Sequence, residues 1–206
     1  MNRLGFLLAR TLRREGPIAA LSAPLVDLRS DLAGKRVALV GNARSLAETT
    51  HGAAIDAADV VIRINRAPMP APQSHGTRTD WLALATSISQ ADLHRIGPKR
   101  ILWMSHKRKR LPWGVARSPG FFLHPLTDYL RLRDRLGAPP TTGLMMIDLC
   151  AASGLSTLSL YGFDFFQSLS LTGSRTAEQV PHDFGAERRF VDELVARDAR
   201  VTIVGQ

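Results

Sequence analysis

The sequence predicts an α/β domain in which a mostly parallel sheet is covered by helices on both faces. Short apolar runs recur along the chain, and segments with helical periodicity lie between them. Short buried strands that alternate with helices are typical of parallel sheets, because each connection must cross the sheet. The length of 206 residues suits one such domain.

Six short apolar runs are predicted as buried strands. Their lengths and their content of aliphatic residues favour strands that are covered on both faces. They are Arg36 to Val40, Val60 to Ile64, Trp81 to Leu84, Ile101 to Met104, Leu158 to Tyr161 and Val201 to Val204. Residues 65–78 and 166–182 are predicted as long loops, and such loops in compact domains are often functional.

Three segments between or after these strands are predicted as helices. Asp128 to Leu136 places leucines among arginines, with Gly137 as the expected C-terminal cap. Gly143 to Ser153 is apolar nearly all round, which indicates a buried helix. Glu187 to Arg197 is amphipathic.

Residues 1–30 are predicted as a basic amphipathic arm, and residues 31–206 as a single domain. The residues at helical spacing are Leu4, Leu7, Leu8 and Leu12, and the basic residues around them are Arg3, Arg10, Arg13 and Arg14. Two interpretations stay open. The leucines pack on the body of the domain, which the short length favours, or the helix lies on a membrane surface.

The chain is basic, and its charge is unevenly placed. Lys and Arg number 27 against 18 Asp and Glu, for a formal net charge of +9. No acidic residue occurs from Leu93 to Thr127. The basic residues there are Arg95, Lys99, Arg100, Lys107, Arg108, Lys109, Arg110 and Arg117. Such a patch suits phosphates, acidic small molecules or anionic lipid, and a solvated face without a ligand is the alternative.

The cysteine content and hydropathy limit the cellular setting. Cys150 is the single cysteine, which excludes an internal disulfide and a cysteine-based zinc cluster. A reducing compartment is therefore expected. No apolar run reaches the roughly 18 residues that indicate a membrane span.

Polar residues follow the first two predicted strands. Gly41 and Asn42 come after the first strand, and Asn65 follows the second. Ligands of open parallel sheets bind beyond the carboxyl ends of the strands, so the two amides converge if these strands are neighbours. Amides suit a ribose or a base, and simple turns are the alternative. The absence of a Gly-x-Gly-x-x-Gly pattern disfavours a nicotinamide oxidoreductase.

Two later segments also carry candidate chemistry. Thr141 or Thr142 can cap the buried helix that opens at Gly143, and its first N–H groups then suit a phosphate or carboxylate. An ordinary capped helix is the alternative. His182 precedes the last predicted helix and suits a general base at neutral pH, although a lone histidine more often has no such role.

Together these segments resemble the animal-type sialyltransferases, glycosyltransferase family 29, over roughly residues 36–190. Three motifs occur in the family's order, which makes the resemblance specific. The similar segments are Val37 to Pro68 (the large sialylmotif), His75 to Asp80 (the stretch that follows it), Pro140 to Phe163 (the small sialylmotif) and His182 with Glu187 (the very small motif).

The resemblance implies a single Rossmann-like sheet, a variant of the nucleotide-sugar transferase fold. It also implies an inverting, metal-independent transferase without a cofactor that uses CMP-sialic acid as donor. The implied catalytic residues are His182, as general base, and Glu187. The implied donor-binding residues are Gly41, Asn42, Asn65, Thr142, Gly143 and Gly162.

The sequence departs from the family pattern in three ways. The two cysteines that pair across the family's fold are replaced by Val37 and by residues around Ser153 and Gly154. No His or Tyr occurs between Phe163 and His182, so Arg175 is the remaining candidate for a phosphate contact. The family's amino-terminal membrane anchor is not recognised.

We therefore expect a compact bacterial-style enzyme, cytoplasmic and peripheral at the inner membrane face. Its expected partners are a CMP-sugar donor, an acceptor such as a surface glycan precursor, and an anionic membrane surface. The alternative is a non-catalytic or nucleic-acid-binding Rossmann-like module that uses residues 95–117. The aromatic content of 6% disfavours nucleic acid.

Overall fold

One parallel sheet organises the part of the chain that the computed structural model describes, residues 1–165 and 180–205. Its strand order within these residues is β5-β4-β3-β2-β1-β6-β7. The strands are β1 (Arg36–Val40), β2 (Val60–Ile64), β3 (Trp81–Leu84), β4 (Arg100–Trp103), β5 (Phe122–Leu123), β6 (Thr157–Tyr161) and β7 (Val201–Val204). The predicted α/β class is confirmed, and each of the six predicted strands occurs within one residue of its expected bounds.

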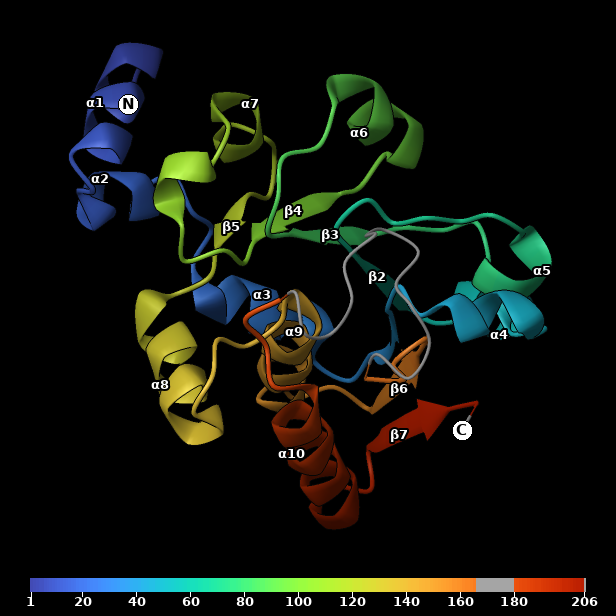
Figure 1. The fold of residues 1–206 in the computed structure, drawn as a ribbon. Coiled ribbons are helices and arrows are strands. Elements are labelled where there is room, and N and C mark those ends of the chain that lie inside the picture. The colour runs from blue at the N-terminus through green and yellow to red at the C-terminus, as the bar shows by residue number, and fades with distance from the viewer. Residues whose placement is uncertain (166–179, 206) are drawn as a thin grey trace.

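Helices cover both faces of this sheet, as predicted (Figure 1). One face carries α3 (Leu25–Leu32), α8 (Leu126–Leu136), α9 (Thr142–Ala151) and α10 (Phe184–Arg197). The other face carries α1 (Arg3–Thr11), α2 (Glu15–Ala19), α4 (Gly52–Asp56), α6 (Gln90–Ile96), α7 (Trp113–Ala116) and the 3-10 turn η1 (Arg44–Glu48). Short connecting turns form α5 (Pro72–His75) and η2 (Arg108–Arg110).

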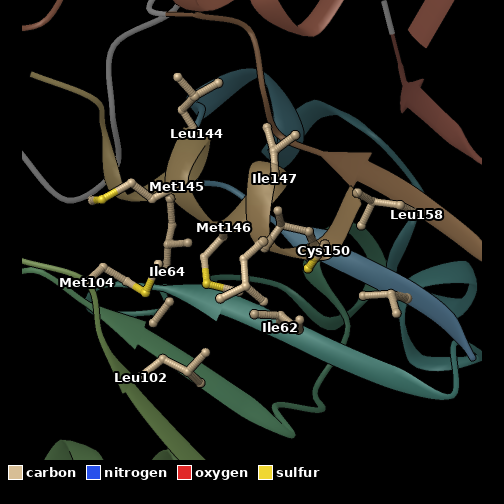
Figure 2. Packing of buried hydrophobic residues seen from close by; sticks show 14 of the residues in the cluster. Ile62, Ile64, Leu102, Met104, Leu144, Met145, Met146, Ile147, Cys150 and Leu158 are labelled. Atoms are coloured by element: carbon tan, nitrogen blue, oxygen red, sulfur yellow. The ribbon is translucent and has the colours of Figure 1, made fainter. Parts of the chain in front are cut away.

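Helix α9 lies against the middle of the sheet, where it forms much of the main core. Met146 and Cys150 point from α9 toward the sheet, where Ile62 lies, and Ile147 belongs to the same buried cluster (Figure 2). All of these side chains are buried. Burial raises the pKa of the Cys150 thiol to about 12, so this cysteine packs as a small apolar group. The predicted buried helix is therefore confirmed.

The leucines of α1 do not pack as expected. Phe6 and Ala9 are buried, and the ring of Phe6 lies 5.0 Å from that of Trp113 on α7. Leu4 and Leu8, one turn apart, remain 76% and 57% exposed, and only Leu7 is half-buried. The expectation that the leucine side of α1 faces the domain is thus wrong, because the sheet side of this helix is the one that carries Phe6.

Candidate functional site

The first strand ends against β6 so closely that only glycine fits. The backbone N–H of Gly41 donates to the carbonyl of Tyr161 at 2.7 Å. A Cβ atom at Gly41 would lie 2.3 Å from the carbonyl oxygen of Gly162. Asn42 follows directly and is buried. The ends of β1 and β6 therefore bring Gly41, Asn42 and Gly162 to one edge of the sheet.

Asn65 lies at the same edge, as the sequence predicts. Strands β1 and β2 are parallel neighbours, with Val40 paired to Arg63, so Asn42 and Asn65 follow adjacent strand ends. Asn65 has a φ of 53°. Its side-chain oxygen accepts a hydrogen bond from the N–H of Ala85 at 3.2 Å. This bond leaves the NH₂ of Asn65 as the group that can donate to a ligand.

Behind Asn65, a buried arginine holds the loop that follows α5. The side chain of Arg63 is 1% exposed and donates to the carbonyls of His75 at 2.6 Å and Arg78 at 2.9 Å. Burial lowers the pKa of Arg63 to about 10, while the nearby Asp56 opposes that shift. The stretch that resembles the family between His75 and Asp80 thus has a structural role: it surrounds this guanidinium.

The amino-terminal end of α9 is capped, and two of its amides are left open. The hydroxyl of Thr141 accepts from the N–H of Leu144 at 3.1 Å. Among the described residues, the backbone N–H groups of Thr142 and Gly143 have no acceptor. A helix end with open N–H groups favours an anion, because these groups carry partial positive charge and can donate hydrogen bonds to it. The predicted threonine cap and open backbone N–H groups therefore both occur at the start of α9.

The ring of Phe163 joins the two parts of the site. A Cβ atom at Gly143 would lie 2.8 Å from the Phe163 ring, and one at Gly41 would lie 3.2 Å from the same ring. The ring thus lies between the end of β1 and the start of α9. The sequence motif that ends at Phe163 does not predict this contact, although an aromatic residue directly after a strand-end glycine indicates a ring close to the end of the sheet.

Glu187, on α10, binds the residue that caps α9. Its carboxylate accepts from the N–H of Thr141 at 2.6 Å and from the Thr141 hydroxyl at 2.7 Å. Burial raises the pKa of Glu187 to about 7, against the lowering effect of the Thr141 bonds. Glu187 is 3% exposed. Its described contacts therefore fit a residue that positions α9.

His182 lies beside the same segment. Its Nδ1 is 2.7 Å from the carbonyl oxygen of Pro139, two residues before the cap. A carbonyl only accepts, so Nδ1 carries the proton in the neutral ring, and Nε2 is then free to accept one. Asp183 caps α10 by accepting from the N–H of Ala186 at 2.8 Å. The segment from Pro139 to Thr141 therefore fixes both His182 and Glu187 next to the start of α9.

A shallow pocket extends this edge past β6 and β7. Its lining consists of Ser45, Leu46, Thr49, Gly162, Phe163, Asp164, Val204 and Gly205. Arg175, the candidate for a phosphate contact, lies outside the described residues. Within the described ranges no group of three or more His, Cys, Asp or Glu side chains is placed to hold a metal. A search of the same ranges finds no helix that could span a membrane.

Comparisons with known proteins agree with the resemblance. The sequence profile of glycosyltransferase family 29 (sialyltransferase) matches residues 23–110. A mammalian sialyltransferase in complex with Gal-beta-1-3GalNAc-ortho-nitrophenol has a similar fold, with a TM-score of 0.64 and 17% identity over 97% of this chain and 84% of that one. The Campylobacter jejuni sialyltransferase CstII in complex with CMP-3FNeuAc gives a TM-score of 0.51 and 15% identity over 82% and 78%. Comparison with curated proteins finds no match.

Proposed function

Starting from the glycosyltransferase family 29 match of residues 23–110, we propose that this chain moves sialic acid, or a related acidic sugar, from a CMP-activated donor to a glycan hydroxyl. The similar fold of sialyltransferases solved with an acceptor analogue and with a CMP-sugar analogue supports this proposal. The observation that carries it is local: His182, Glu187 and the open end of α9 are all held by residues 139–141. We place the enzyme in the cytoplasm.

The donor would bind across the carboxyl ends of β1, β2 and β6. Asn42 and Asn65 offer amides for the ribose or base of CMP. The N–H groups of Thr142 and Gly143 offer donors for the phosphate or the sugar carboxylate. As the bond between sugar and phosphate breaks, negative charge grows on the departing CMP, and fixed N–H dipoles stabilise it without reorganisation. Gly41 and Gly162 carry no side chain, so the backbone at the ends of β1 and β6 can approach the donor closely.

His182 is the proposed general base. With Nδ1–H held by the Pro139 carbonyl, Nε2 can remove the proton from the acceptor hydroxyl as that oxygen attacks the sugar. A single displacement of this kind inverts the configuration at the sugar carbon. It needs no metal in this proposal, since the helix end and nearby donors take the charge of the leaving group. Glu187 acts through Thr141 and keeps α9 in register with His182.

The test compares His182→Ala with a matched histidine variant, His94→Ala, which alters an exposed histidine on α6. We expect wild-type protein to bind CMP and to hydrolyse or transfer from CMP-sialic acid. Loss of the base should lower the transfer rate by about 10²–10⁴ while CMP affinity stays within a few fold. The product configuration and the rate in EDTA test inversion and metal independence. Failure to bind millimolar CMP would reject the enzyme proposal, and full activity of His182→Ala would reject the base.

A further inference from the structure

The exposed side of α1 is apolar, although the segment around this helix is rich in arginine. Leu4, Leu8 and Leu12 are spaced by four residues and are 76%, 57% and 52% exposed. Residues at this spacing lie along one side of a helix. Met1, which precedes the helix, is 50% exposed as well. The opposite side of α1 is held to the domain through Phe6 and Ala9.

The structure brings the basic run after β4 against this helix. The guanidinium of Arg10 donates to the carbonyl of Leu111 at 2.9 Å, next to η2. Arg108 is buried and pairs with Glu15 of α2 at 2.7 Å, which ties the two segments from the other side. Helix α1 also packs on α7 (Figure 1). Two basic stretches that are far apart in the sequence therefore form one surface.

The cations around the leucine stripe are not neutralised. Glu15 is the single acidic residue in residues 1–24 and 93–127, and Arg108 already pairs with it. Within α1, in the residues directly after it and in residues 107–110, the exposed cations that have no ion pair within the described residues are Arg3, Arg13, Arg14, Lys107, Lys109 and Arg110. Arginines and lysines beside an exposed leucine stripe fit the interface of an anionic bilayer, where the stripe enters the acyl region and the cations meet the headgroups.

We propose that α1 together with residues 107–110 docks this protein on an anionic phospholipid surface. Leu4, Leu8 and Leu12 are the inserting side chains, and the six cations contact lipid phosphates. Turn η2 follows the carboxyl end of β4, so docking places that edge of the sheet beside the lipid. Neither the candidate donor-binding residues nor His182 takes part, so this proposal stands apart from the proposed function.

The experiment measures co-sedimentation with vesicles of phosphatidylcholine that contain phosphatidylglycerol, against vesicles of phosphatidylcholine alone. One variant carries Lys107→Gln, Lys109→Gln and Arg110→Gln. Its matched control carries Arg29→Gln, Lys35→Gln and Arg197→Gln, three exposed cations outside the patch. Each basic side chain near an anionic surface contributes about fivefold, so the first variant should lose roughly a hundredfold in partitioning. The control should change little.

A second pair of variants tests the leucines. Leu4→Ser with Leu8→Ser should weaken vesicle binding by about tenfold or more, while Val26→Ser with Leu130→Ser, two other exposed apolar residues, should not. All four proteins should keep wild-type CMP binding. Equal losses in a variant and its control, or unchanged binding in all of them, would overturn the proposal. Leucine-dependent self-association without lipid, or RNA binding that needs the three cations but not the leucines, would also overturn it.

Discussion

Replacing Thr141 by valine tests whether Glu187 holds the start of α9. Valine keeps the shape of the side chain and removes the hydroxyl. Two hydrogen bonds of that hydroxyl are lost: the one accepted from the Leu144 N–H at 3.1 Å and the one donated to the Glu187 carboxylate at 2.7 Å. The bond from the Thr141 N–H to the same carboxylate, at 2.6 Å, survives. The variant therefore leaves one buried carboxylate oxygen without a donor.

The expected cost follows from these two losses. Removal of an N-cap costs about 1 kcal/mol, and a buried acceptor left without a partner costs about 1–3 kcal/mol. The free energy of unfolding should therefore fall by about 2–4 kcal/mol, which lowers the Tm by roughly 5–12 °C for a domain of this size. The loss should grow with pH. The Thr141 bonds lower the pKa of Glu187, so losing the hydroxyl raises the folded pKa of Glu187 further above its unfolded pKa. Because the two pKa values then differ more, more stability is lost as the pH rises above the unfolded pKa.

Urea unfolding of Thr141→Val at pH 5 and pH 8 is the assay, with Thr141→Ser as control. Serine keeps the hydroxyl and should stay within about 1 kcal/mol of wild type. CMP affinity of the valine variant should also fall, because the open N–H groups lie on the turn that has lost its cap. A valine variant as stable as wild type at both pH values would refute the idea that this contact fixes α9.

Three further predictions concern buried groups around the same edge. The contribution of Glu187 to stability should fall by up to roughly 3 kcal/mol as the pH rises from about 4.5 to about 7, because burial raises its folded pKa to about 7. Burial lowers the pKa of His124 to about 4, which acts in the opposite direction over this range, so urea titrations should show the fall as the difference between wild type and Glu187→Gln. Gly41→Ala should cost roughly 2 kcal/mol or more in thermal unfolding, since its Cβ would lie 2.3 Å from the Gly162 carbonyl oxygen. Arg63→Lys should lower the free energy of unfolding by roughly 2–4 kcal/mol in the same assay. An ammonium keeps the charge, but it cannot reproduce the several hydrogen bonds that the guanidinium donates to the carbonyl of His75 and its neighbours. A loss below about 0.5 kcal/mol would contradict the role of Arg63 in holding this loop.

Strong local patterns made most of the sheet predictable. Val60 to Ile64 forms a strand whose bounds agree with the prediction, because an aliphatic run in a buried parallel strand needs little from its surroundings. Strand β5 was missed, since its two residues, Phe122 and Leu123, show no periodicity. Pairing with β4 and the bond from the Leu123 N–H to the Ser22 hydroxyl at 2.8 Å specify it instead. Contacts of that range leave no local signal.

The site was predictable at the level of residue types and strand ends, but its internal contacts were not. Adjacent strands bring Asn42 and Asn65 to one edge, as topology requires. By contrast, the catalytic role that the resemblance implies for Glu187 stays a prediction, and the contact of its carboxylate with Thr141 was not predicted. The sequence separation of these two residues hides that contact. The orientation of α1 failed for a related reason: spacing identifies an apolar side, and only the surface of α7 decides which side is buried.

The missing disulfide illustrates how the same connection can be made without cysteine. The resemblance implies a cross-link between the position of Val37 and the region of Ser153 and Gly154. In this chain β1 and β6 pair along their whole length, and the N–H of Gly34 donates to the carbonyl of Gly154 at 2.8 Å. The guanidinium of Arg200 then donates to the carbonyl of Ser153 at 3.0 Å, which fastens the end of α9 beside β7. Because these bonds need no oxidant, the end of α9 is held equally well in a reducing compartment, and the opposite end remains free to carry the N–H groups proposed to bind the donor.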